Sequence, residues 1–215
     1  MDLPSTASAT IAAERSSLWP RVIDRLEQAA IILLWVFLVR RMVDADNPLA
    51  ILVLVAETSI VVLNTIRRST DDISVNPSDW VLAATATGVV MLVQPEPTPW
   101  PALVPIGVLL VTFGNLLQLS AKLFLLRSFG IAPANRGVKV NGIYKIVRHP
   151  MYAGYLITHI GVMVLMPSML NFFIYFIGWT AQILRLLAEE RLLGEDPSYR
   201  EYMARVRWRL IPGIY

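Results

Sequence analysis

Long uncharged apolar runs constrain this chain more than any other feature. Met151 to Leu184 contains no Asp, Glu, Lys or Arg over 34 residues, and Trp100 to Ala121 is a second such run. A helix needs about 20 apolar residues to cross the roughly 30 Å hydrocarbon core of a bilayer. Only 16% of the residues are charged, against about a quarter in soluble domains. The sequence therefore predicts an integral membrane protein of the all-α class, a polytopic bundle of transmembrane helices.

Five or six membrane segments can be placed in this bundle. As one helix, the 34-residue run would be about 50 Å long, more than a bilayer requires, and Pro167-Ser168 lies at its midpoint. We therefore predict a C-terminal helical hairpin with arms at 151–166 and 169–193. A Pro-rich turn at 94–99 cannot continue a helix. The remaining segments are expected at about 26–43, 48–66, 80–93 and 100–126, of which the first is the weakest.

The chain divides into three parts. Residues 1–28 are expected to be mobile and then amphipathic, because Trp19, Val22, Ile23 and Leu26 recur at helical spacing. Residues 29–126 would hold the N-terminal transmembrane helices, and 127–215 the C-terminal region with its polar motifs. Its tail, 197–210, has the pattern of an amphipathic helix, which would lie on an anionic leaflet or cover a site as a lid.

Basic residues set the predicted orientation. The loop from Arg127 to Arg148 holds five basic residues and no acidic ones, so it should face the cytoplasm together with the Arg-rich tail. Arg40 and Arg41 do not fit this topology if the segment at 26–43 spans. The net charge of +3 is spread over such loops, which does not favour nucleic-acid binding. The absence of cysteine excludes disulfides and thiolate sites, and two histidines ten residues apart do not predict a zinc site.

The most distinctive polar residues lie where the basic loop meets the hairpin, at Arg148-His149-Pro150. Pro150 suits the first position of a helix because its missing N–H costs nothing there. His149 would then be the N-cap, and the free amides of the first turn could bind a carboxylate or phosphate. Tyr152 and Tyr155 would share a face that runs into the membrane. Interfacial anchoring explains such tyrosines but not the Arg-His-Pro triplet, so we expect a polar site here.

Two polar stripes point to the same end of the bundle. One is Asn115, Gln118 and Lys122, and the other is Gln182, Arg185 and Glu189. Polar side chains at membrane depth usually face the bundle interior or a water-filled cavity. Hydrogen bonding between helices is the alternative for Asn115 and Gln182.

Acidic residues are scarce in the apolar segments. Glu189-Glu190, between a basic loop and a basic tail, is suited to holding a cation. Glu57 stands alone in the second segment, and we expect it to be structural, with Thr58 and Ser59 satisfying its carboxyl group.

The motifs taken together resemble one family. The run Gly142 to Tyr144, the element from Arg148 to Gly154, and Glu189 to Leu193 are similar to the isoprenylcysteine carboxyl methyltransferases and related membrane phospholipid methyltransferases. The resemblance covers roughly the last 100 residues, from about Ser128. It implies an S-adenosylmethionine-dependent methyltransferase with a cytoplasmic cofactor pocket cradled by His149, Tyr152, Gly154, Glu189 and Glu190. It also implies that Arg148 lies near the transferred methyl group and that Tyr144 lines the pocket.

The chemistry of these residue types agrees with the resemblance. A carboxylate acceptor is already nucleophilic and needs a guanidinium to orient it, a role that fits Arg148. An amine acceptor must lose a proton, which calls for a base such as Glu190 or His149. The carboxylate of the cofactor would bind the amides after Pro150 or Lys139.

Gln118 completes the predicted cofactor set, because its stripe lies at the level of the Arg-His motif. The predicted catalytic residues are thus Arg148 and Glu190. The predicted partners are membrane lipids and a lipophilic acceptor, either a prenylcysteine-like carboxylate or a phospholipid amine. Two alternatives stay open, a membrane reductase of related architecture that uses NADPH and a non-catalytic membrane scaffold.

Overall fold

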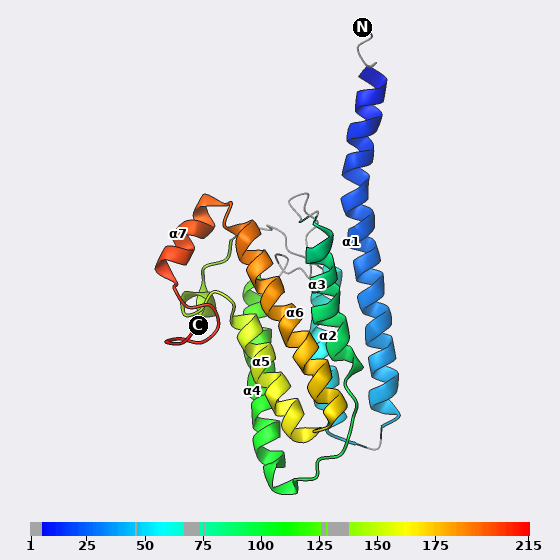
Figure 1. The fold of residues 1–215 in the computed structure, drawn as a ribbon, viewed down its shortest axis with the longest axis vertical. Helices are drawn as coiled ribbons and strands as arrows, with labels where there is room; N and C mark the ends of the chain where they lie inside the picture. The colour runs from blue at the N-terminus through cyan, green and yellow to red at the C-terminus, as the bar shows by residue number, and fades with distance from the viewer. Residues whose placement is uncertain (1–5, 46, 67–73, 75, 126–127, 129–137) are drawn as a thin grey trace.

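A computed structural model describes residues 6–45, 47–66, 74, 76–125, 128 and 138–215, and in these parts every regular element is helical (Figure 1). The α-helices are α1 (Thr6–Val43), α2 (Ala50–Ile66), α3 (Pro77–Gly88), α4 (Val104–Leu125), α5 (Pro150–Leu165), α6 (Met169–Leu193) and α7 (Pro197–Arg205). Three short 3₁₀ helices join them, η1 (Val89–Leu92), η2 (Pro101–Leu103) and η4 (Gly142–Lys145). The all-α class is therefore confirmed.

The helices pack in antiparallel pairs. α4 runs along α5, α3 along α6, and α1 along α2. α1 is continuous from Thr6, so the predicted lead-in belongs to the same helix as the first apolar segment. Figure 1 shows that this helix extends well beyond the ends of its neighbours. Residues 1–5, the start of the segment expected to be mobile, lie outside the described residues.

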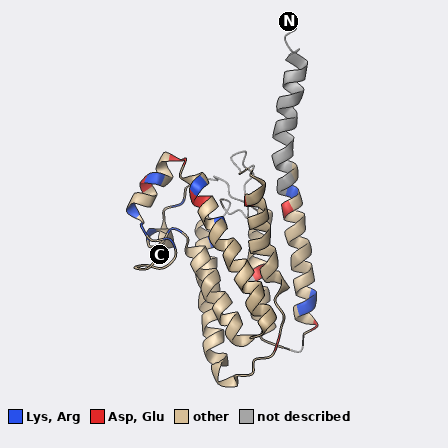
Figure 2. Ribbon diagram, in the orientation of Figure 1, with Lys and Arg blue, Asp and Glu red and all other residues tan. Residues whose placement is uncertain are grey.

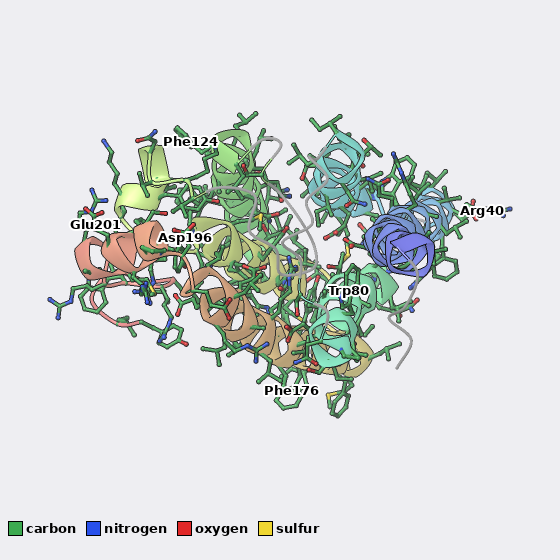
Figure 3. The ribbon with its side chains drawn as sticks, turned by 90° about the horizontal axis from the view of Figure 1, so that it is seen from above. Arg40, Trp80, Phe124, Phe176, Asp196 and Glu201 are labelled. Atoms are coloured by element: carbon green, nitrogen blue, oxygen red, sulfur yellow. The ribbon has the colours of Figure 1, made fainter. Side chains whose placement is uncertain are left out.

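Two helical stretches are long and apolar enough to cross a membrane, Pro101–Leu125 and Met169–Leu193. α2 and α5 are apolar but shorter. Large apolar side chains face outward along the bundle, and Figure 3 shows Phe124 and Phe176 at its outer edges. Charged residues gather mainly around α7 and the adjoining helix ends, while the body of the bundle has few (Figure 2). This distribution fits a helix bundle whose sides contact lipid.

Glycines allow α4 and α5 to approach at backbone distance. Gly107 and Gly114 recur seven residues apart on α4, and Gly154 and Gly161 do so on α5. A Cβ atom on Gly154 would lie 2.9 Å from the Gly114 carbonyl oxygen, and one on Gly161 would lie 2.9 Å from that of Gly107. Small residues at such spacing are the usual means of close helix packing in membranes.

The hairpin is confirmed at the predicted position. α5 ends at Leu165, and Ser168 caps α6 by accepting a hydrogen bond from the Asn171 backbone N–H at 3.1 Å. The Asn171 side chain also donates to the Gln94 carbonyl at 2.9 Å, which ties the hairpin turn to the Pro-rich segment.

Arg41 lies at this same end of the bundle. It donates to the carbonyl groups of Leu92 and Val93 at 3.0 and 2.9 Å, next to the end of η1. Its charge is therefore satisfied by a helix end, where carbonyl groups lack intrahelical partners.

The predicted tail helix is too long by five residues. α7 ends at Arg205, Val206 is extended, and no helix follows it. The backbone N–H groups of Arg148 and His149 donate to the carbonyls of Trp208 and Arg209, each at 2.8 Å. The apolar face expected for this helix was Tyr199, Tyr202, Met203, Val206 and Leu210, and all of these except the partly buried Met203 are buried. Tertiary hydrogen bonds thus replace the helical ones over the last part of the tail.

Candidate functional site

The site forms where the start of α5, the end of α6 and the tail meet. Pro150 is the first residue of α5, as predicted, and His149 is its N-cap residue. No side chain caps this helix start, because His149 turns its ring to α6 instead. The free amides of the first turn and the positive end of the helix dipole are therefore available for an anionic group.

Glu190 is the centre of the first part of the site. Its Oε1 accepts a hydrogen bond from Arg148 Nε at 2.7 Å and lies 3.1 Å from His149 Nε2. Its Oε2 accepts one from Arg209 Nε at 2.8 Å. The side chains of Arg148, His149 and Glu190 are each less than a tenth exposed, so the charge-assisted bonds between them are poorly screened by solvent.

Glu189 is the centre of the second part. Its Oε1 accepts a hydrogen bond from the Tyr152 hydroxyl at 2.7 Å and lies 3.3 Å from Arg185 Nε. The Arg185 guanidinium also lies over the Tyr152 ring, 5.5 Å from its centroid. The two adjacent carboxylates of α6 therefore hold different partners, and both face the start of α5.

An aromatic column continues from the site into the bundle. The Tyr152 ring packs edge-on against Tyr155, which stacks on His159 with centroids 6.1 Å apart. Trp179 Nε1 donates to His159 Nδ1 at 3.1 Å. The predicted shared face of Tyr152 and Tyr155 is therefore confirmed, and both residues are buried together with His159.

The tail closes the site on one side. The Tyr202 hydroxyl donates to the Tyr144 carbonyl at 2.7 Å, which joins α7 to η4. Burial raises the pKa of Tyr202 to about 12 and also raises the pKa of Tyr199. The hydrogen bond to the Glu190 carboxylate raises the pKa of the Arg209 guanidinium. The sequence allowed two positions for the tail, on the membrane surface or over the site. In the structure, the tail lies over the site.

The structure also gives the surroundings of the four other residues predicted to bind the cofactor. Tyr144 is buried, and its hydroxyl lies 3.5 Å from the Ala121 carbonyl. Gln118 donates to the Thr158 hydroxyl at 2.9 Å, deeper in the α4–α5 interface, and not to either carboxylate. Gly154 packs against α4, where a Cβ atom would lie 2.7 Å from Gln118 Cγ. Lys139 is exposed in the segment before η4. Of the four, Tyr144 is the one that the described contacts tie to the tail, through its carbonyl group.

The polar stripes face inward as predicted, but their partners differ from the expectation. Lys122 is fully buried and donates to the Ser59 hydroxyl at 2.6 Å. Thr58 donates to the Leu54 carbonyl. The Thr58 hydroxyl therefore does not donate to Glu57, whose Oε2 has no hydrogen-bond partner among the described residues.

Glu57 lines a small cavity with Gln182 and Arg185. The cavity measures about 10 Å³, enough for roughly one water molecule and too small for a nucleotide-sized cofactor.

Sequence reasoning missed Arg209. The residue was one of several arginines in the tail, and no local pattern distinguished it from Arg207, which stacks on Trp208. Only its place opposite Glu190, 19 residues away along the chain, separates the two.

Residues 101–196, from the start of η2 to the residue before α7, match the family model described as phospholipid methyltransferase. This region is similar to that family. The match includes Arg148, His149, Tyr152, Glu189 and Glu190, and it confirms the resemblance drawn from the motifs. The family implies methyltransferase activity in general and association with a membrane. A comparison with curated proteins found no match to the chain.

Proposed function

We propose that this protein is an integral membrane methyltransferase that uses S-adenosylmethionine and acts on a lipophilic acceptor. The observation that carries the proposal is the pair of adjacent carboxylates on α6, held against Arg148, His149 and Tyr152 at the end of a long apolar helix, within the matched phospholipid methyltransferase region. The cluster is polar, mostly buried and lies at the end of the bundle where charged residues gather.

The residues present fit the cofactor. When bound, S-adenosylmethionine supplies a methyl group on a cationic sulfonium, which an acceptor takes by in-line displacement. The Glu189 carboxylate suits the cationic part of such a molecule. The uncapped amides at the start of α5 suit its carboxylate. Buried tyrosines and the tail exclude water from this end of the bundle, which favours displacement over hydrolysis.

Arg148 is assigned to the acceptor. Its Nε donates to Glu190 and its Nη1 donates to the Val206 carbonyl at 3.2 Å. A guanidinium has five N–H donors in a fixed fork, so these two bonds leave about three for a ligand. A carboxylate or phosphate next to the reacting atom would be oriented by this fork.

Glu190 is assigned an orienting role. Both of its oxygens already accept hydrogen bonds, so it is not the group that takes a proton from an amine acceptor. His149 remains the residue within reach for that role if the acceptor is an amine. An acceptor with an anionic group is favoured, because the donors of Arg148 are the ones available.

The experiment is incubation of the purified protein with a native membrane lipid extract and methyl-labelled S-adenosylmethionine. We expect label in a lipid product, and its chemical class identifies the acceptor. Arg148→Ala should abolish transfer, while Arg200→Ala, an exposed arginine of α7, serves as the matched control. Calorimetry with S-adenosylhomocysteine and with NADPH separates a methyltransferase from a reductase. Binding of NADPH alone, or no transfer to any extract, would contradict the proposal.

The site would face the cytoplasm, because the Arg-rich tail lies at this end of the bundle. The chain has no native cysteine, so single cysteines can report its orientation cleanly. Glu201→Cys in α7 should be protected from an impermeant maleimide in intact cells, and Glu96→Cys, in the loop at the other end, should be labelled. The reverse pattern would refute the orientation.

A further inference from the structure

The Glu190 carboxylate is divided between two arginines from different parts of the chain. Oε1 accepts from Arg148 Nε at 2.7 Å, and Oε2 accepts from Arg209 Nε at 2.8 Å. Arg148 precedes α5, whereas Arg209 lies in the tail beyond the matched region 101–196. The two guanidinium groups therefore share a single carboxylate, whose Oε1 also lies 3.1 Å from His149 Nε2.

Arg209 is held in place independently of Glu190. Its carbonyl accepts the His149 N–H at 2.8 Å, and its own N–H donates to the Tyr215 carbonyl at 3.0 Å. The guanidinium also lies 5.1 Å from the centroid of the Tyr215 ring. These backbone hydrogen bonds fix the position of the Arg209 Cα atom, and from there the side chain can reach Oε2.

The division matters because arginine and carboxylate groups commonly pair in a bidentate manner, with two parallel hydrogen bonds. If Oε2 were free, Arg148 could turn its fork onto both oxygens of Glu190. That pairing would use up N–H groups that otherwise point away from Glu190. With Oε2 already taken, Arg148 bonds to Glu190 through Nε alone.

We propose that Arg209 is a positioning residue for the acceptor. By occupying Glu190 Oε2, it keeps Arg148 from pairing in a bidentate manner and leaves the terminal N–H groups of Arg148 that do not bond to Val206 for an anionic group of the acceptor. This inference rests on the proposed function of Arg148. It assigns a role in the reaction to the tail, which lies outside the family match.

The variants are Arg209→Gln, Arg209→Lys and, as the matched control, Arg207→Gln. Arg207 is exposed and lies two residues from Arg209, so the control removes the same charge from a nearby surface position. Glutamine is neutral and cannot form an ion pair with the Glu190 carboxylate, whereas the lysine ammonium can occupy Oε2 as a point charge.

The first measurement needs no ligand. Nitrogen-15 spectra of arginine side chains in detergent report how freely the terminal nitrogens of Arg148 rotate, with assignment from Arg148→Lys. In Arg209→Gln we expect this rotation to slow, because Arg148 closes on both Glu190 oxygens. Arg207→Gln and Arg209→Lys should leave the Arg148 signals as in the wild type. Unchanged Arg148 signals in Arg209→Gln would overturn the proposal.

The second measurement is methyl transfer to the lipid extract. Arg209→Gln should raise the extract concentration that gives half-maximal rate by roughly tenfold or more, the size expected when one charge-assisted hydrogen bond to the acceptor is lost. The affinity for S-adenosylhomocysteine should stay within about twofold of the wild type. If the affinity for S-adenosylhomocysteine fell by the same factor as the apparent affinity for the extract, Arg209 would only hold the tail in place. That result would also overturn the proposal.

The outcomes separate this inference from the proposed function. A wild-type protein that transfers no methyl group contradicts the proposed function, and the ligand-free spectra still decide whether Arg209 controls Arg148. If Arg209→Gln does not fold, Arg209→Lys carries the test. Altered Arg148 signals in that variant, despite an ammonium available for Oε2, would refute the role assigned to Arg209.

Discussion

Replacing Glu190 with Gln tests whether the divided carboxylate holds the C-terminal part of the protein together. The substitution keeps the shape of the side chain and removes its charge. Arg148 and Glu190 are only 8% and 9% exposed at their side chains, so the change leaves an uncompensated, nearly buried guanidinium. Removing one partner of a buried ion pair costs about 3–5 kcal/mol. The bond to Arg209, whose side chain is 34% exposed, adds no more than about 1 kcal/mol because solvent screens it.

The assay is thermal unfolding of purified protein in detergent. For a chain of this size, 1 kcal/mol corresponds to roughly 2–4 °C in Tm. The total loss of about 3–6 kcal/mol in Glu190→Gln should therefore lower Tm by about 6–24 °C. Glu201→Gln is the matched control, because Glu201 is 73% exposed and its contact with Arg205 is 3.6 Å long. Its effect should stay below about 1 kcal/mol. Equal Tm values for the two variants would refute the reasoning, since the buried network would then contribute nothing that a surface pair does not.

Three further predictions follow from packing, hydrogen bonding and titration. Gly154→Ala should destabilise the protein by about 1–3 kcal/mol in the same unfolding assay, because the new Cβ atom would meet backbone atoms of α4. In the control Gly88→Ala, the Cβ atom would meet only a flexible side chain, so the cost should be less than about 1 kcal/mol. Tyr152→Phe should reduce S-adenosylhomocysteine affinity in calorimetry by roughly tenfold or more, because its hydroxyl orients a carboxylate, whereas Tyr199→Phe should be neutral, because that hydroxyl has no partner among the described residues. Stability should fall as pH rises from about 10 to about 12, because unfolded tyrosines ionise near 10 while burial raises the pKa of Tyr202 to about 12, so the unfolded chain binds fewer protons in that window. Tyr202→Phe should flatten this slope in unfolding measured against pH, and an unchanged slope would contradict the assignment.

The start of α5 and the hairpin could be predicted from the sequence because their signals are local. Pro150 fits only the first turn of a helix, and Pro167-Ser168 interrupts a run too long for one span. The inward direction of the polar stripes was also predictable, because helical spacing alone puts Gln182 and Arg185 on one face.

The partners of these side chains could not be predicted, since a periodic pattern gives a face but not what lies opposite. Gln118 is an example. Its inward direction was predicted correctly, but Thr158 on α5 lies opposite it, and the Gln118 side chain donates to that hydroxyl and not to the carboxylates. Gly154 is another. Its place in the motif did not indicate that it packs against the backbone of α4.

The sequence by itself determined the helical class, the hairpin and the segment that carries the site, because apolar run length, proline position and charge are properties of neighbouring residues. Tertiary structure alone decided that the tail ends its helix at Arg205 and that Arg209, not Arg207, meets Glu190. The physical reason is that these choices depend on hydrogen bonds between α6, the start of α5 and the tail. Such bonds exist only after the helices have packed.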